Sequence, residues 1–149
     1  MLCSVGVDRQ LLFWDLRQPN APVIRLREVH KSDINTVDWC ALNDNYVSTG
    51  SNDTLVKLID TRRAASQSDA GMAQSNKLTS SQSPIVGTLH KHKSKVHTVK
   101  FSNFSSQYLA SSGDSLVFWD IKDIHQQADD AAEQAGVAEN LSAALEQRA

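Results

Sequence analysis

Short stretches in which apolar and polar positions alternate run along the first 124 residues, separated by turn residues. Stretches such as Ile34–Trp39 and Val96–Phe101 are rich in β-branched and aromatic residues, which favour strands. Two further stretches begin with proline, at Pro22 and Pro84, which is typical of edge strands. The pattern therefore predicts ten β-strands and an all-β fold.

Three units of strand, turn and strand repeat within this pattern. They are CSVGVDRQLLFWD (residues 3–15), STGSNDTLVKLID (residues 48–60) and ASSGDSLVFWD (residues 110–120). The aspartates that end the units lie 45 and then 60 residues apart. A period of about 40–45 residues that ends in Trp-Asp is typical of the WD repeat, the unit of a β-propeller.

The resemblance to WD repeats implies an incomplete propeller in residues 1–124, because a closed one needs roughly four to eight blades. We expect about two and a half to three blades of four-stranded antiparallel sheet, at residues 1–29, 30–90 and 91–124. Repeat units bury their faces only against neighbours, so the chain by itself should be marginally stable.

Two segments depart from the strand pattern. Residues 64–83 are rich in Ser, Ala and Gln and predict a disordered insertion between two strands of the second blade. Residues 125–149 are rich in Ala, Glu and Gln and predict a helical or disordered tail.

The WD resemblance also implies a buried hydrogen-bond network in each blade. A turn aspartate accepts a hydrogen bond from the N–H of a loop histidine, a hydroxyl links the imidazole to an indole, and the tryptophan packs in the blade. The residues at these positions are His30, Thr49 and Asp53 in the second blade; His92, Ser111, Asp114 and Trp119 in the third; and Ser4, Asp8 and Trp14 in the first.

Two departures from this arrangement have expected costs. Ile59 stands where the second blade should have its tryptophan, and the missing indole should weaken that blade by about 1 kcal/mol. Asp114 precedes Trp119 by five residues, whereas the other two turn aspartates precede the matching position by six. We expect the shorter turn to distort the third network.

His92, Ser111 and Asp114 can also be interpreted as a Ser-His-Asp triad of a hydrolase. A triad needs an exposed nucleophile and an oxyanion hole, and the sequence suggests neither. We therefore predict no catalytic residues, no cofactor, no metal site and no small-molecule substrate.

A narrower resemblance rests on LCSVGVDRQLLFWDLR, HKSDINTVDW, STGSNDTLVKLIDTRR, HKSKVHTVKFS and LASSGDSLVFWDIKDI. These strings resemble the retinoblastoma-binding type of histone-binding WD-repeat proteins, and within it the plant FVE type. The family implies a seven-bladed histone chaperone subunit of chromatin-assembly, deacetylase and Polycomb-type complexes. The implied partners are histones or chromatin-complex subunits, and the implied location is the nucleus, with the cytoplasm as a second compartment.

The same family implies contacts for a basic histone. Asp33 and Asn35 match the acidic and amide residues of its top face, whereas Lys95 and His97 depart from them. Residues 91–95 make that rim basic, which would repel a basic tail. Asp129 and Asp130 resemble in charge an acidic loop of the family that grips a histone helix.

A second kind of partner is suggested by the string from Trp14 to Arg17, WDLR, and by its degraded copy, which ends in Arg62. Such WDxR strings resemble the motif that docks on the damage-binding adaptor of cullin-RING ubiquitin ligases. The alternative is a surface ion pair between Asp15 and Arg17 without a partner.

Composition narrows the class of protein further. Hydrophobic residues make up 40%, charged residues 21%, and the net charge is -2, which argues against a general nucleic-acid-binding surface. No apolar run approaches the roughly 18–20 residues of a membrane span. The two cysteines, Cys3 and Cys40, form no disulfide framework, so we expect a reducing compartment.

Overall fold

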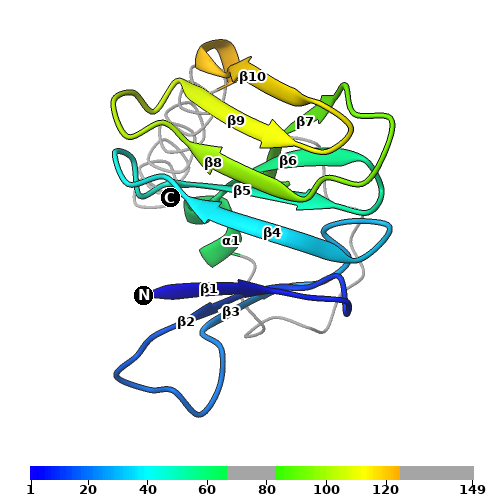
Figure 1. The fold of residues 1–149 in the computed structure, drawn as a ribbon. Coiled ribbons are helices and arrows are strands. Elements are labelled where there is room, and N and C mark those ends of the chain that lie inside the picture. Colours follow the sequence, from blue (N-terminus) through cyan, green and yellow to red (C-terminus); the bar gives the residue numbers. More distant parts are fainter. Residues whose placement is uncertain (67–82, 125–149) are drawn as a thin grey trace, which may run out of the picture.

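The computed structural model describes residues 1–66 and 83–124, which form three antiparallel sheets and one short helix (Figure 1). The first sheet holds β1 (Leu2–Val5), β2 (Leu11–Trp14) and β3 (Ile24–Leu26). The middle sheet holds β4 (Ile34–Trp39), β5 (Tyr46–Ser51), β6 (Leu55–Asp60) and β7 (Ile85–His90). The third sheet holds β8 (Thr98–Phe101), β9 (Tyr108–Ser112) and β10 (Leu116–Asp120). The prediction of an all-β fold is confirmed.

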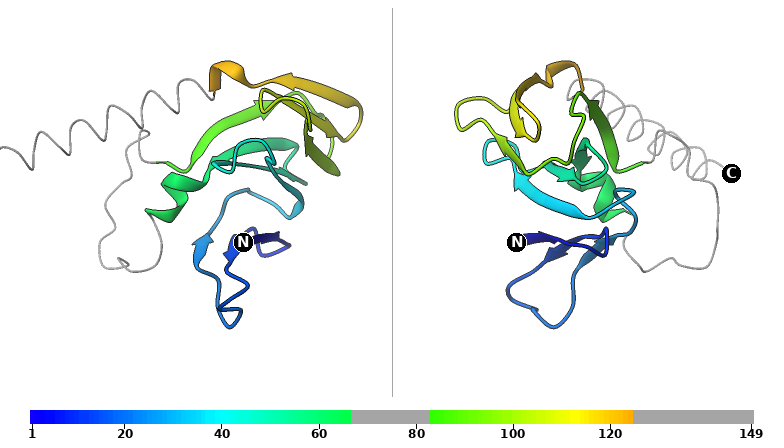
Figure 2. Two further views of the ribbon diagram at one scale, coloured as in Figure 1. Left: turned by 90° about the vertical axis from the view of Figure 1, so that its left-hand side faces the viewer. Right: turned by 45° about the vertical axis from the view of Figure 1, so that its right-hand side comes forward.

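Each sheet is an up-and-down meander, because strands that follow one another in the sequence also pair. The sheets stack face to face, and β1, β4 and β8 lie side by side along one edge of the stack (Figures 1 and 2). The turns between β5 and β6 and between β9 and β10 therefore lie at one end of the stack, together with the loops that precede β4 and β8.

Two apolar cores separate the three sheets, as the alternation of apolar and polar positions dictates. Side chains such as Phe13, Val47 and Ile59 are fully buried between the first and middle sheets. Tyr46, Leu58 and their neighbours are fully buried between the middle and third sheets. The middle sheet is covered on both faces, and this sandwiching holds the described part of the chain together.

Polar side chains join the middle and third sheets along the seam of β4 and β8. The Asp38 carboxylate accepts the backbone N–H of Phe101 at 2.7 Å and also pairs with Lys100 Nζ. Thr36 Oγ1 accepts the backbone N–H of Val99 at 3.2 Å. These bonds supply β8 with partners that its open edge would otherwise lack.

The outer faces of the first and third sheets carry exposed apolar side chains. Leu116 is 63% exposed and Phe118 is 76% exposed on β10, and Leu2 on β1 is 51% exposed. Alternate positions of the same strands are more enclosed: Val117 is buried and Trp119 partly buried on β10, and Cys3 and Val5 are partly buried on β1. Each outer face therefore has the pattern of a surface that a further sheet would cover.

The insertion predicted for residues 64–83 begins too early. Residues Thr61–Ala65 form the helix α1, whose N-cap Asp60 accepts the backbone N–H of Arg62 at 2.9 Å. Ala64 is fully buried in the core next to the first sheet. Alanine favours helix, and the N-cap Asp60 stabilises the first turn. Together they form a helix where the Ser- and Ala-rich composition had predicted disorder. Residues 67–82 of that prediction, and the predicted tail 125–149, lie outside the described residues.

Candidate functional site

The middle sheet holds the most buried group of polar side chains. His30 Nδ1–H donates to both carboxylate oxygens of Asp53, each at 3.0 Å. On the other side of the ring, the Thr49 hydroxyl donates to Nε2 at 2.9 Å. Asp53 also accepts the backbone N–H groups of Lys31 and Leu55. The carboxylate therefore closes the loop before β4 onto the turn between β5 and β6.

The third sheet repeats the arrangement with the indole added. The Trp119 indole N–H donates to Ser111 Oγ at 2.8 Å, and the Ser111 hydroxyl donates to His92 Nε2 at 2.7 Å. His92 Nδ1–H donates to one oxygen of Asp114 at 3.2 Å. The Asp114 side chain is 35% exposed, against 8% for Asp53. The contact is thus looser on the shorter turn.

The first sheet holds a reduced version of the same group. The Trp14 indole N–H donates to Ser4 Oγ at 2.9 Å, and the Asp8 carboxylate accepts the backbone N–H of Gln10 at 3.2 Å. In the middle sheet, Ile59 occupies the position of the tryptophan and packs in the core instead. The three groups share one pattern, except that Ile59 replaces the tryptophan in the group of the middle sheet.

The geometry of these groups suits support rather than reaction. Ser111 is 1% exposed and His92 is 7% exposed, and the hydroxyl is already engaged by both the imidazole and the indole. A nucleophile must be reachable by substrate, which this one is not. Within residues 1–66 and 83–124, no three His, Cys, Asp or Glu side chains gather closely enough to hold a metal ion. None of the helices in those ranges is both long enough and apolar enough to span a membrane.

We expect the stability of the chain to fall as the pH falls from 7 towards 4. Burial lowers the pKa of His30, outweighing the attraction of Asp53, so the unfolded chain binds a proton there more readily. This contribution to stability is present above the unfolded histidine pKa of about 6.5 and is lost below it. Burial raises the pKa of Asp53, but the N–H donors of Lys31 and Leu55 and the contact with His30 lower it overall. A second loss therefore follows when the pH falls below about 4.

Urea unfolding at a series of pH values measures this dependence. The variant His30→Gln should flatten the profile between pH 7 and pH 5, and His97→Gln, which changes an exposed side chain, should leave it unchanged. A wild-type chain that is equally stable at both ends of that range would contradict the assignment.

The two WDxR arginines form local ion pairs. Arg17 forks onto Asp15, with Nη2 at 2.6 Å from one oxygen, and its side chain is 88% exposed. The Arg17 hydrogen bonds lower the pKa of Asp15 to about 2. Arg62 forks in the same way onto Asp60, whose side chain is fully buried. Arg17 follows β2 and Arg62 follows β6, and both strands run away from the histidine loops, so the two arginines lie at the opposite end of the stack.

Asp33 and Asn35 lie at the histidine end, and the structure gives them different surroundings. The Asn35 amide donates to Val96 O and to Asn52 Oδ1, each at 2.8 Å. Asn35 therefore joins the middle sheet to the third. Asp33 is partly exposed; its carboxylate accepts the side-chain amide of Asn52 at 3.3 Å, and its backbone carbonyl accepts the Asn52 backbone N–H at 2.9 Å. Asp129 and Asp130 lie outside the described residues.

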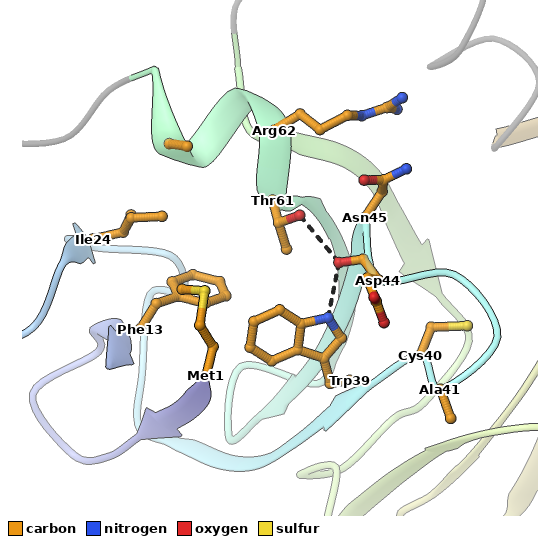
Figure 3. Close-up of a pocket in the computed structure, with 11 residues that line it drawn as sticks. Met1, Phe13, Ile24, Trp39, Cys40, Ala41, Asp44, Asn45, Thr61 and Arg62 are labelled. Carbon is orange, nitrogen blue, oxygen red and sulfur yellow. Dashed lines mark hydrogen bonds between the residues drawn. The ribbon is translucent and has the colours of Figure 1, made fainter. Parts of the chain in front are cut away.

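A pocket of about 690 Å³ opens between the first and middle sheets, at the same end as Arg62 (Figure 3). Phe13 and Trp39 meet edge to face in it, with their ring centroids 5.3 Å apart. The carbonyl of Asp44 accepts the Trp39 indole N–H at 2.9 Å and the Thr61 hydroxyl at 3.2 Å, which fixes the rim. The pocket can hold an apolar side chain. Sequence reasoning missed it, although the paired aromatic positions were visible.

The described geometry agrees with a comparison against protein families. The model of the WD domain, G-beta repeat, matches residues 22–60 and 83–120, which is half of the chain. The chain belongs to the WD-repeat family. The three sheets are accordingly blades of an incomplete propeller, as the sequence predicted.

Individual WD-repeat relatives narrow the comparison. The WD-40 repeat-containing protein MSI4 of Arabidopsis thaliana is 43% identical over 61 residues, which is 41% of this chain. The histone acetyltransferase type B subunit 2 of Debaryomyces hansenii is 24% identical over 87% of the chain, and the ribosome biogenesis protein WDR12 homolog of Nematostella vectensis is 30% identical over 75%. The matches span 12%, 29% and 22% of these relatives, so the chain corresponds to a minor part of each. The resemblance to the FVE type, and to histone-binding WD-repeat proteins, is confirmed.

Proposed function

We propose that this chain is part of a non-catalytic, chromatin-associated scaffold that binds histones in the nucleus, with the cytoplasm as a second location. The observation that carries the proposal is the similarity to MSI4 together with that to a protein named as a histone acetyltransferase subunit. The burial of His92 and Ser111 supports the non-catalytic part of the proposal. These side chains hold loops in place in the interior, so partners would bind at the surface of the blades.

Asp33 is the contact residue that the structure favours for a basic histone segment. Asp33 is partly exposed and, among the described residues, its carboxylate accepts a single bond from the Asn52 amide, whereas both amide protons of Asn35 are used within the protein. Asn35 would act by holding the two blades in register. Asp129 and Asp130 extend the proposal as further acidic contacts on sequence grounds alone.

Retention of core histones on the immobilised chain at moderate salt tests this function. We expect Asp33→Lys to reduce retention, because it reverses the charge that meets the basic segment. Asp44→Lys is the matched control, since it reverses an exposed aspartate at the opposite end of the stack and should retain histones as the wild type does. A wild-type chain that retains no histone would remove the proposal.

A second candidate function is that of a substrate receptor for a cullin-RING ubiquitin ligase. The exposure of Arg17, with its guanidinium held in a fixed orientation by Asp15, supports a docking role. The presence of Arg62 at the same end adds a second basic group. This role and histone binding use opposite ends of the stack.

Loss of binding to the damage-binding adaptor on Arg17→Ala tests the receptor role. The exposed side chain can be removed without opening the core, so urea unfolding should be unchanged. Arg62→Ala should also weaken adaptor binding, but it removes the main partner of the buried Asp60 carboxylate and should destabilise the chain as well. Equal adaptor binding by wild type and Arg17→Ala would exclude the role.

A further inference from the structure

A dense positive patch lies at the histidine end of the third sheet. We call residues 91–97, which form the loop before β8, the third-sheet rim. The rim contains three lysines and no acidic residue. Lys91, Lys93 and Lys95 are exposed, and none of them forms an ion pair with another described residue. The charge of the patch is therefore not neutralised by direct contacts within the described chain.

The rim is held rigidly by backbone contacts. The N–H of Lys93 donates to Asp114 at 3.1 Å, and that of His97 donates to Ser112 O at 2.7 Å. The N–H of Val96 donates across to the middle sheet, to Ser51 O at 2.9 Å. Ordering the lysines therefore costs less on binding than ordering those of a free loop, because the backbone is fixed beforehand.

The turn between β9 and β10 packs so closely against the rim that Gly113 could not carry a side chain. A Cβ on Gly113 would lie 2.8 Å from the carbonyl oxygen of Lys95 and 3.0 Å from His92 Nδ1. His92 is turned inward to Ser111, which leaves the lysines on either side of it directed to solvent. By holding His92 inward, the hydrogen-bond network of the third sheet keeps the neighbouring lysines at the surface.

The middle sheet provides an internal comparison. Its equivalent loop reads HKSDIN over residues 30–35, and the rim reads HKSKVH over residues 92–97. The two loops share the histidine, the lysine and the serine, and each closes onto a turn aspartate. They differ at Asp33, whose place is taken by Lys95. The middle loop therefore balances Lys31 with Asp33, whereas the rim is basic throughout.

One carboxylate lies against the rim and offsets part of its charge. The backbone N–H of Lys93 and the Nδ1–H of His92 bond to Asp114 and lower its pKa, so this carboxylate stays ionised. The three lysines outnumber it, and Asp53 is enclosed by His30 and two backbone donors. Asp33 is bonded to the Asn52 amide. The whole chain has a net charge of -2, so the attraction of the rim for an anion is local and not a property of the overall charge.

We propose that the third-sheet rim binds an acidic peptide segment of a partner protein. The complementarity of charge selects carboxylates and rejects a Lys- and Arg-rich tail at this blade. The site goes beyond histone binding and does not depend on it, because a basic segment would engage Asp33 on the adjacent loop. The two loops together would let one scaffold hold partners of opposite charge side by side.

Fluorescence anisotropy with a labelled peptide of alternating glutamate and serine tests the site on the whole 149-residue chain. We expect binding that weakens as ionic strength rises, and a loss of about tenfold on Lys93→Glu with Lys95→Glu. The control is Arg27→Glu with Lys122→Glu, which makes the same change in net charge at two other exposed positions. Equal losses in the two double variants, or no binding by the wild type, would overturn the proposal.

Lys95→Asp is the sharper variant, because it converts the rim to the HKSD string that folds in the middle sheet. We expect it to weaken the glutamate peptide and to strengthen a matching peptide of alternating lysine and serine. A folding defect would weaken both peptides, so the opposite signs identify a change in charge. The histone retention of this variant should not fall, which separates failure of the rim from failure of the proposed function.

Discussion

Asp53→Ala is expected to lower the free energy of unfolding by about 3 kcal/mol, because it leaves the buried His30 Nδ1–H and two backbone N–H groups without their acceptor. The Asp53 carboxylate is 8% exposed and accepts His30 Nδ1–H together with the backbone N–H groups of Lys31 and Leu55. The His30 side chain is fully buried, so water cannot replace the lost carboxylate at the ring. Urea unfolding at pH 7 followed by tryptophan fluorescence measures the change.

The other two turn aspartates make a graded control. Asp8 is exposed and accepts a single backbone N–H, so Asp8→Ala should change stability by no more than about 0.5 kcal/mol. Asp114→Ala should fall between the two, because His92 is buried but the carboxylate itself is open to water. Equal losses at Asp8 and Asp53 would show that the turn, and not the network, determines the effect.

The sequence was sufficient to place these networks because their members lie at fixed separations from a turn. A histidine 23 residues before Asp53, and another 22 before Asp114, come together only if the chain makes two hairpin strands between them. The strand pattern predicted those hairpins independently, so the two signals reinforced each other. The shorter spacing before Trp119 also indicated the looser contact at Asp114 that the structure shows.

The contacts between sheets could not be predicted in the same way. Thr36 and Asp38 bond to Val99 and Phe101, more than 60 residues further along the chain. Their partners depend on which faces of two sheets meet and in what register, and alternation along one strand does not contain that information. Asn35, for example, was predicted from the sequence to contact a partner, and only the structure shows that its amide also holds Val96.

The polar seam also explains why the third sheet should be sensitive to packing. Within the part of the chain that the structure describes, side chains of the middle sheet supply partners to β8 along its inner edge. Gly50 lies directly beneath this contact: a Cβ there would be 2.6 Å from Val96 Cγ1 and 2.9 Å from Thr36 Cγ2. Because Val96 is fully buried and its branched side chain cannot rotate away, the backbone must move instead.

Gly50→Ala is therefore expected to cost about 1–3 kcal/mol and to loosen the third sheet first. Hydrogen exchange should show this as faster exchange at the N–H groups of Val99 and Phe101, which bond to the middle sheet. Gly6→Ala is the matched control, since a Cβ at Gly6 would meet nothing closer than the Asp8 carboxylate at 3.5 Å. It should leave exchange in the third sheet unchanged.

Combining Gly50→Ala with Val96→Ala separates overpacking from any effect on strand propensity. Removing the two methyl groups of Val96 relieves the closest contact of the new Cβ and leaves the one with Thr36 Cγ2, so the double variant should lose less stability than the sum of the single changes. Additive losses would show that Gly50→Ala destabilises the chain through the backbone of β5 and not through the contact with Val96. A favourable coupling would show that the glycine is needed because two blades meet at that point, and that their separation is set by Val96.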